Sequence, residues 1–265
     1  MLALTLQVKA YANAQLTLVK ELLESALEGL KADLQVRGVT SRRWVQVTVS
    51  GEDENMAVSF LAREFGQCPE RLDLVHRFST LKGRVRGLGD SKAEVLVDVG
   101  IVSPRVVDAV LPLAQLQAQL VDGRKVALEK ISQLFGLCEN LPLTVKVTGV
   151  SEEERVVEAM LAEKQLMSFR GWTLSLLDRL LVFGVPVGDV ESALERAECG
   201  RDVVDVESLG LFEHAVVCKL GTDAAGLIPR IGRRLRRASF SVFNPRRILE
   251  FLPDGSTMFA SQHVR

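Results

Sequence analysis

The sequence is poor in the residues that bind metals or cross-link secreted domains. Its four cysteines, Cys68, Cys138, Cys199 and Cys218, stand too far apart in the 265 residues to form a C-x-x-C ligand pair. Apolar runs fall short of the roughly 18 residues of a membrane span, and the first ten residues alternate like a strand instead of forming a leader. We therefore expect a soluble cytoplasmic protein with buried free thiols, no metal, no cofactor and no membrane partner.

Signatures of catalysis are also lacking. His76 and His263 have no serine or cysteine nearby in a nucleophile motif. His214 and Cys218 are four residues apart, but their stretch reads as a strand, where this spacing puts two side chains on one face without making them ligands. The sequence thus supplies no catalytic residue and no metal site.

What the sequence does contain is a concentration of positive charge near its C-terminus. Seven arginines and no acid or lysine fall between positions 224 and 249. The other 26 basic residues stand against 34 acidic ones, so a charge of +7 lies on a body of −8. Because guanidinium groups grip phosphate oxygens in bidentate fashion, this asymmetry makes an anionic partner, and nucleic acid first, the leading hypothesis.

The spacing of these arginines predicts a helix. Arg230, Arg233, Arg234 and Arg237 follow the i, i+3, i+4, i+7 rule, and Leu227, Ile231 and Leu235 would face inward. The alternative is a solvated basic helix whose arginines pair with the chain's own acids. Like charges at these spacings repel, so the cluster needs compensating acids or a ligand, and both interpretations stay open. The adjoining Arg246 and Arg247 extend the predicted nucleic-acid surface.

The order of strands and helices predicts an α+β protein with three modules, residues 1–79, 80–147 and 148–265. The two outer modules read as ferredoxin-like split βαβ units that flank a small barrel. In the first we expect strands over 2–10 and 44–49, helices over 16–34 and 56–65, and an extended stretch over 72–78. In the last we expect helices over 152–166 and 187–197, strands over 179–183, 202–206 and 214–220, the arginine helix, and a hairpin of 248–252 with 256–260.

The middle module has short strands with glycine turns, including Gly83-Arg84-Val85, residues 94–100 and Leu111-Pro112, and a helix is expected over 125–137. This pattern resembles the OB-fold RNA-binding repeat of exosome subunits and polynucleotide phosphorylase. The resemblance implies that Lys82, Arg84 and Arg86 follow a phosphate backbone. Where such repeats carry aromatic rings for base stacking, this chain has Ala93, Val95 and Val97, which fit a barrel core.

The turn Gly221-Thr222-Asp223 is a possible anion-binding site, because it opens a helix. It lacks the G-x-x-x-x-G-K-[ST] spacing of a phosphate loop, and Asp223 would repel a phosphate, so a structural helix cap is the competing interpretation.

The stretch 209–229, together with Gly171-Trp172 and Asp178-Arg179, resembles an uncharacterised archaeal family catalogued as domain of unknown function 2110. The resemblance implies an archaeal cytoplasmic origin and brings no assigned activity.

From these observations we expect a non-catalytic RNA- or ribonucleoprotein-binding protein of the archaeal information-processing machinery. One alternative is an interaction module of the transcription or translation apparatus whose basic patch meets an acidic protein. Another is an enzyme that uses Asp223, Lys219 and His214 around the turn at 221–223.

Overall fold

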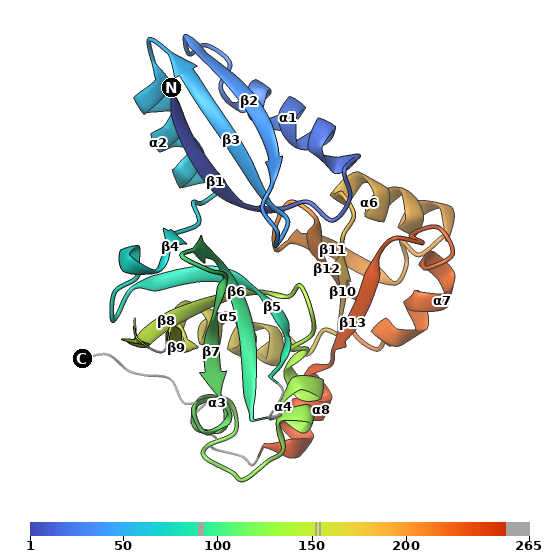
Figure 1. The fold of residues 1–265 in the computed structure, drawn as a ribbon. Helices are drawn as coiled ribbons and strands as arrows, with labels where there is room; N and C mark the ends of the chain where they lie inside the picture. The colour runs from blue at the N-terminus through green and yellow to red at the C-terminus, as the bar shows by residue number, and fades with distance from the viewer. Residues whose placement is uncertain (90–92, 152, 154, 253–265) are drawn as a thin grey trace, which may run out of the picture.

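The computed structural model describes all residues except 90–92, 152, 154 and 253–265, and it has three sheets in three modules (Figure 1). The expected turn at 253–255 and the strand at 256–260 lie outside the described residues. No helix in the described part of the chain is long and apolar enough to cross a membrane. The α+β class and the barrel between two flanking sheets are as the sequence predicted.

The N-terminal module is a three-stranded antiparallel sheet in the order β1-β3-β2. Both helices pack on one face through Val19, Leu23, Ala57 and Leu61, which are fully buried. The elements are β1 (Leu2–Lys9), α1 (Gln15–Ala26), β2 (Ala32–Val39), β3 (Trp44–Gly51) and α2 (Glu54–Glu64).

The expected helix over 16–34 is wrong in its second half. The helix ends at Ala26, a turn with Gly29 at a φ of 92° follows, and β2 begins at Ala32. Gly29 adopts this left-handed conformation at low cost. The apolar residues from Leu30 to Val36 then alternate with polar ones, which is the period of a strand.

The free edge of β1 is closed by the chain that leaves α2. Leu6 forms an isolated bridge with Gln67, and the backbone N–H of Cys68 donates to the carbonyl of Thr5 at 2.8 Å. This segment stands where a ferredoxin-like unit has its fourth strand. The chain then enters the barrel through β4 (Glu70–Arg71) and a 3-10 turn, Leu72–Leu74, in place of the expected extended stretch.

The central module is a closed five-stranded barrel. Its strands follow the circular order β6-β5-β8-β9-β7, the β6–β7 pairing closes the ring, and β7 and β9 are its parallel pair. This is the connectivity of an OB fold, and α3 (Leu113–Leu120) and α4 (Leu128–Phe135) precede the fourth strand. Val95 and Val97 are fully buried, which confirms the core role predicted for them. The strands are β5 (Thr80–Leu88), β6 (Glu94–Ser103), β7 (Val107–Pro112), β8 (Pro142–Ser151) and β9 (Val156–Leu161).

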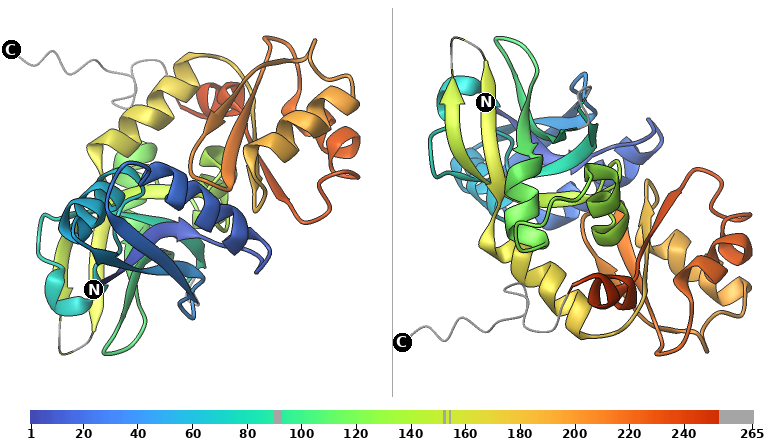
Figure 2. Two further views of the ribbon diagram at one scale, coloured as in Figure 1. Left: turned by 90° about the horizontal axis from the view of Figure 1, so that it is seen from above. Right: turned by 90° about the horizontal axis from the view of Figure 1, so that it is seen from below.

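The helix expected over 152–166 is wrong, because its middle is strand β9. In β9 the buried residues Val157, Ala159 and Leu161 alternate with more exposed ones, and the strand pairs with β8. The barrel therefore continues beyond residue 147, which lies within β8. Helix α5 (Glu163–Leu174) follows and lies between the barrel and the C-terminal module (Figure 2). There Phe169 contacts the rings of Phe135 on α4 and of Phe243 on β13 (Ser239–Phe243).

The C-terminal module is ferredoxin-like. Its sheet has the order β11-β12-β10-β13, and all three pairings are antiparallel. The strand expected at 248–252 is wrong, since this segment belongs to a helix, α8 (Pro245–Phe251). Asn244 caps this helix by accepting from the N–H of Arg247 at 3.1 Å, and Pro245 suits its first turn. The remaining elements are β10 (Arg179–Phe183), α6 (Val187–Arg196), β11 (Val203–Ser208), β12 (Glu213–Cys218), the 3-10 turn η2 (Ala224–Leu227) and α7 (Ile228–Ile231).

A buried polar network joins the three modules. Arg84 of the barrel pairs with Glu213 of the C-terminal module at 3.1 Å, and the Tyr11 hydroxyl of the N-terminal module donates to the same carboxylate at 2.6 Å. The indole N–H of Trp44 donates to Asp98 at 2.9 Å, and the Arg84 guanidinium lies 5.7 Å from the Trp44 ring. Burial and the neighbouring carboxylate raise the pKa of Tyr11, so its hydroxyl stays protonated and donates.

Gly210 makes room for this network. A Cβ at this position would lie 1.9 Å from a carboxylate oxygen of Glu213 and 2.8 Å from a guanidinium nitrogen of Arg84. Because both groups are buried and held by partners, a larger residue would displace the carboxylate from its cation.

We therefore predict that Gly210→Ala lowers the free energy of unfolding by on the order of 2–4 kcal/mol, since separating a buried ion pair is strongly destabilising. Urea denaturation measures the change. Gly188→Ala is the matched control, because Gly188 has open space around its Cβ position and lies in α6. Equal stability of the two variants would contradict the role of Gly210.

Candidate nucleic-acid interface

The arginine segment does not form the predicted helix. Helix α7 covers only Ile228–Ile231, and Arg233, Arg234, Arg236 and Arg237 lie on turns that follow it. Gly232, the residue at which the helix ends, has low helix propensity. The predicted inward residues are nevertheless buried, because the turns keep them against the sheet: Leu227, Ile231 and Leu235 are at most 5% exposed.

Two of the arginines have structural partners. Arg230 forms an ion pair with Asp202 at 2.5 Å and donates to the carbonyl of Ala197 at 3.1 Å. Arg234 donates to the carbonyl of Arg196 at 3.2 Å, at the end of α6. A cation at a helix C-terminus satisfies free carbonyls and complements the helix dipole. Arg230 and Arg234 are therefore paired with groups of the chain itself, as the alternative interpretation of the arginine cluster expected.

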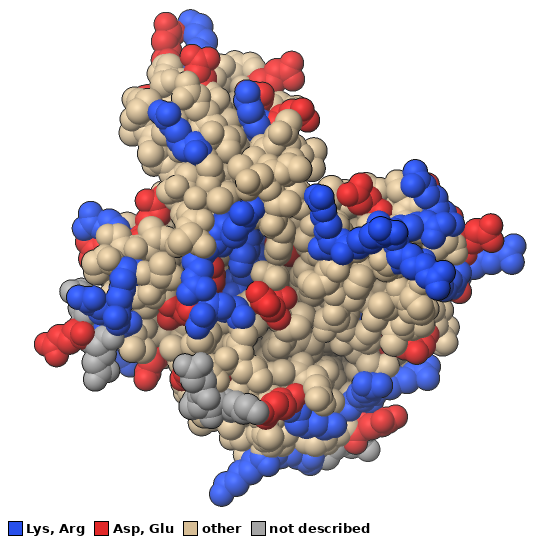
Figure 3. Space-filling view, turned by 45° about the vertical axis from the view of Figure 1, so that its right-hand side comes forward, with Lys and Arg blue, Asp and Glu red and all other residues tan. Residues whose placement is uncertain are grey.

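A groove near the end of α6 is lined by several arginines. Arg196, Arg234, Arg236 and Arg237 border a hollow of about 400 Å³ between α6 and the turns after α7, which we call the arginine groove. Among the described residues, no acid pairs with Arg233, Arg236 or Arg237, all of which are exposed. Asp189 on α6 is the acid in the lining. Figure 3 shows basic side chains in a band across the C-terminal module.

Arg246 and Arg247 lie apart from this groove, on α8. They line a smaller pocket of about 240 Å³ that also contains the turn at 221–223, Asp178 and Asn244. Asp223 accepts from the N–H of Ala225 at 3.0 Å and so caps η2.

The second carboxylate of this pocket, Asp178, accepts from the side-chain amide of Asn244 at 3.0 Å. Burial raises its pKa, and the nearby Asp223 adds to the effect. The two carboxylates offset the charges of Arg246 and Arg247, so the pocket has no excess positive charge to hold an anion at the turn.

The three cations predicted on the barrel point the same way from β5 but have different surroundings. Arg84 is only 6% exposed and belongs to the network between the modules. Arg86 is exposed and pairs with Asp108 on β7 at 2.8 Å. Lys82 is exposed, and among the described residues it has no ion-pair partner. Sequence reasoning therefore grouped side chains that the fold separates.

The face on which OB folds bind oligonucleotides is covered by the N-terminal module. That face belongs to the second and third strands, here β6 and β7. Asp98 on β6 receives the Trp44 indole at 2.9 Å, and Asp108 on β7 lies 3.6 Å from the guanidinium of Arg42. The two acids and the contacts with the N-terminal module oppose the binding of a phosphate backbone on this face.

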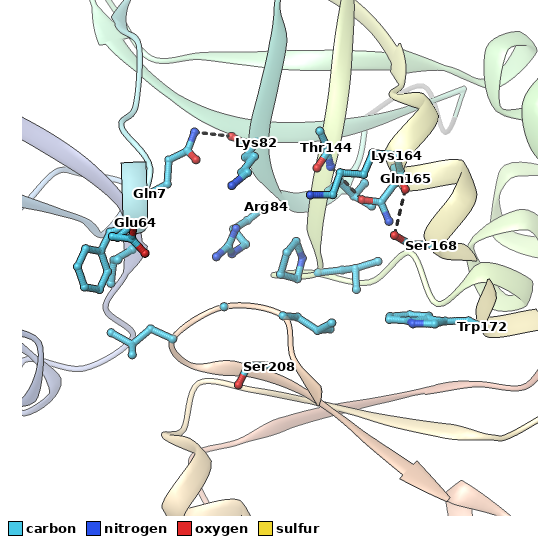
Figure 4. Close-up of a pocket in the computed structure, with 18 residues that line it drawn as sticks. Gln7, Glu64, Lys82, Arg84, Thr144, Lys164, Gln165, Ser168, Trp172 and Ser208 are labelled. Carbon is cyan, nitrogen blue, oxygen red and sulfur yellow. Dashed lines mark hydrogen bonds between the residues drawn. The ribbon is translucent and has the colours of Figure 1, made fainter. Parts of the chain in front are cut away.

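A further hollow, the junction cleft, lies where the three modules meet, and its volume is about 570 Å³. Figure 4 shows Lys82 and Arg84 from β5 and Lys164 from α5 pointing into it. Trp172 and the turn between β11 and β12 form further walls. Sequence analysis missed Lys164, because a single lysine on a helix gives no signal.

The residues of the enzyme alternative are not brought together. His214 is at the start of β12 and is 1% exposed, with its Nε2 2.9 Å from the carbonyl of Val185. Asp223 follows the other end of this strand, whose length from His214 to Cys218 is about 13 Å at ~3.3 Å per residue. No group of three or more potential ligands capable of holding a metal occurs among the described His, Cys, Asp and Glu residues.

The chain belongs to the DUF2110 family. The family's N-terminal, central and C-terminal domains match residues 3–71, 76–173 and 177–243. This match confirms the resemblance found in the sequence. Among curated proteins, none matches this chain.

Several solved structures resemble parts of the chain at low sequence identity. Protein MJ1198 from Methanocaldococcus jannaschii is 15% identical, with 34% of this chain and 95% of that one covered and a TM-score of 0.24. The intact alpha subunit of aIF2 from Pyrococcus abyssi is 10% identical, with 64% and 96% covered and a TM-score of 0.25. GSP13 from Bacillus subtilis is 16% identical, with 34% and 58% covered and a TM-score of 0.25. At these scores the function has to be argued from the chain's own residues.

We predict that His214 makes the stability of the protein depend on pH. Desolvation lowers the pKa of this buried imidazole below its usual value of about 6.5. The unfolded chain then binds the proton more readily, so the stabilising contribution is present above about pH 6.5 and is lost as the pH falls. Thermal melts between neutral and mildly acidic pH should show a smaller decline for His214→Gln than for the wild type. Parallel declines would contradict this assignment.

Proposed function

We propose that this member of the DUF2110 family is a non-catalytic protein that binds structured RNA, or a ribonucleoprotein, through the arginine groove. The observation that carries the proposal is a set of exposed arginines that have no ion-pair partner among the described residues: Arg236 and Arg237 in the lining of the groove, and Arg233 near them in the chain. Neighbouring cations without partners repel one another, and a polyanion relieves that repulsion while releasing its own counterions.

The chemistry of the groove favours the nucleic-acid backbone over the bases. Its described lining contains no aromatic ring on which a base would stack. Guanidinium groups bind phosphate oxygens in bidentate fashion, and such contacts position a nucleic acid without reading its sequence. We therefore expect binding to folded or double-helical RNA with little sequence preference. A partner of this kind would place the protein in the information-processing machinery.

The covered face of the barrel supports the same choice of surface. A free OB face would compete as the binding site, but here Trp44 and Arg42 occupy the outer sides of β6 and β7. The C-terminal module carries the unpaired positive charge instead.

We predict that the triple variant Arg233→Gln, Arg236→Gln, Arg237→Gln binds duplex RNA more weakly, whatever its sequence. Each lost phosphate contact should reduce the slope of log affinity against log salt by roughly one unit. The melting temperature should hardly change, because none of the three side chains has an ion-pair partner among the described residues. Fluorescence anisotropy over a salt series measures both quantities.

The matched control removes the same charge from the N-terminal module: Lys20→Gln, Lys31→Gln and Arg63→Gln. These cations already pair with Glu24, Glu52 and Glu64, so RNA affinity should fall much less. An unchanged salt slope in the folded arginine variant, or an equal loss in the control, would refute the proposal. Competition by an acidic peptide as strong as that by RNA would indicate a protein partner instead.

A further inference from the structure

We propose that the junction cleft binds a nucleoside phosphate, with Lys82 and Lys164 holding the phosphate. This site is separate from the arginine groove and contributes a second, small-molecule binding activity. The ligand's source is either a free nucleotide or the phosphorylated end of an RNA chain, which share the same chemistry.

Three cations from two elements converge on the cleft. Lys82 and Arg84 come from β5, and Lys164 comes from the first turn of α5 (Figure 4). Glu213 neutralises Arg84 at 3.1 Å, whereas neither lysine forms an ion pair with any described residue. Bringing two unpaired ammonium groups to one cavity costs electrostatic free energy that a bound anion would offset.

The acids near the cleft are already engaged. Glu64 lines the cleft, and its carboxylate accepts from Arg63 at 2.9 Å. Glu213 is 1% exposed and is shared by Arg84 and Tyr11. The positive charges of Lys82 and Lys164 are therefore not balanced by the acids that line the cleft.

A buried donor behind the lysines also lacks a partner. The side chain of Arg84 is 7% exposed, and its Nε has no hydrogen-bond partner among the described residues. Buried polar groups without partners are uncommon in folded proteins and often mark the place of a ligand or water. Although Glu213 balances the charge of Arg84, its Nε–H remains an unused hydrogen-bond donor on a residue that lines the cleft.

The other walls suit the base and ribose of a nucleotide. Leu141, Pro142, Leu209 and Leu211 provide apolar surface, and Trp172 adds an aromatic ring. Polar groups without charge, such as the amide of Gln7, stand among them. A volume of about 570 Å³ lies within the roughly 300–1,000 Å³ typical of small-molecule sites. Apolar walls with a few converging cations fit a molecule that has a flat ring at one end and a phosphate at the other.

Calorimetric titration of the full chain with AMP, ADP and ATP tests this proposal directly. Adenosine and ribose 5-phosphate are the comparison ligands, because each lacks one of the two ends. We expect the nucleotides to bind at least tenfold more tightly than either. A 5′-phosphorylated oligoribonucleotide compared with its unphosphorylated form distinguishes an RNA end from a free nucleotide as the source.

The variant Lys82→Gln with Lys164→Gln should weaken nucleotide binding about 10- to 100-fold, since charge-assisted hydrogen bonds to phosphate are lost. Lys20→Gln with Lys31→Gln loses the same charge far from the cleft and should bind as the wild type does. Ser168→Phe, an exposed position on α5 that lines the cleft, should block binding without changing any charge.

Three results would overturn the proposal: no binding of any nucleotide or phosphorylated oligonucleotide, equal binding of ribose 5-phosphate, or unaltered binding in both cleft variants. This test is independent of the proposed RNA binding, because none of the residues that line the arginine groove lines the junction cleft. If RNA did not bind at the groove, the titration with mononucleotides would still decide this proposal.

Discussion

The arrangement of the three modules depends on one buried ion pair, Arg84 with Glu213. Neither group can be left alone, because removing one partner of such a pair costs about 3–5 kcal/mol. Each module contributes to it: the barrel gives the cation, the C-terminal module the carboxylate, and the N-terminal module the hydroxyl of Tyr11. Because Gly210 has no side chain, the turn between β11 and β12 can approach this pair. The network therefore determines which surfaces of the modules meet.

The same pair determines where positive charge is available for a ligand. Lys82, Arg84 and Arg86 alternate along one side of β5, and a free barrel would present all three together. In the folded chain Arg84 pairs with Glu213 and Arg86 pairs with Asp108, whereas Lys82 lines the junction cleft. Of these three cations, only Lys82 has no acid partner among the described residues once the modules have docked.

Most of the fold was predictable because its signals are local. Hydrophobic alternation located most of the strands, although β2, β9 and β13 were not expected, and the ferredoxin-like and OB-like modules followed from their order. Strand β9 was missed because the acids at 152–154 look like the first turn of a helix. The prediction of an arginine helix was wrong because Gly232 ends α7 and the turns after it bury Leu235, whereas the spacing of the arginines alone favoured a longer helix. The network was beyond sequence reasoning, since the two residues of its central ion pair, Arg84 and Glu213, stand 129 positions apart.

The two outer modules have the same strand order: the third strand of each module, β3 or β12, lies between its first and second strands. Each module packs beside a different part of the barrel. In an OB fold that acts alone, the outer face of β6 and β7 would be the surface for nucleic acid. Here that face carries Asp98 and Asp108, whose charges suit the indole N–H and guanidinium groups that cover it. Acids at these positions stabilise docking of the N-terminal module and oppose a phosphate backbone on this face. Our proposals place anions at two sites where cations have no ion-pair partner among the described residues: Lys82 and Lys164 in the junction cleft, and Arg236 and Arg237 in the arginine groove.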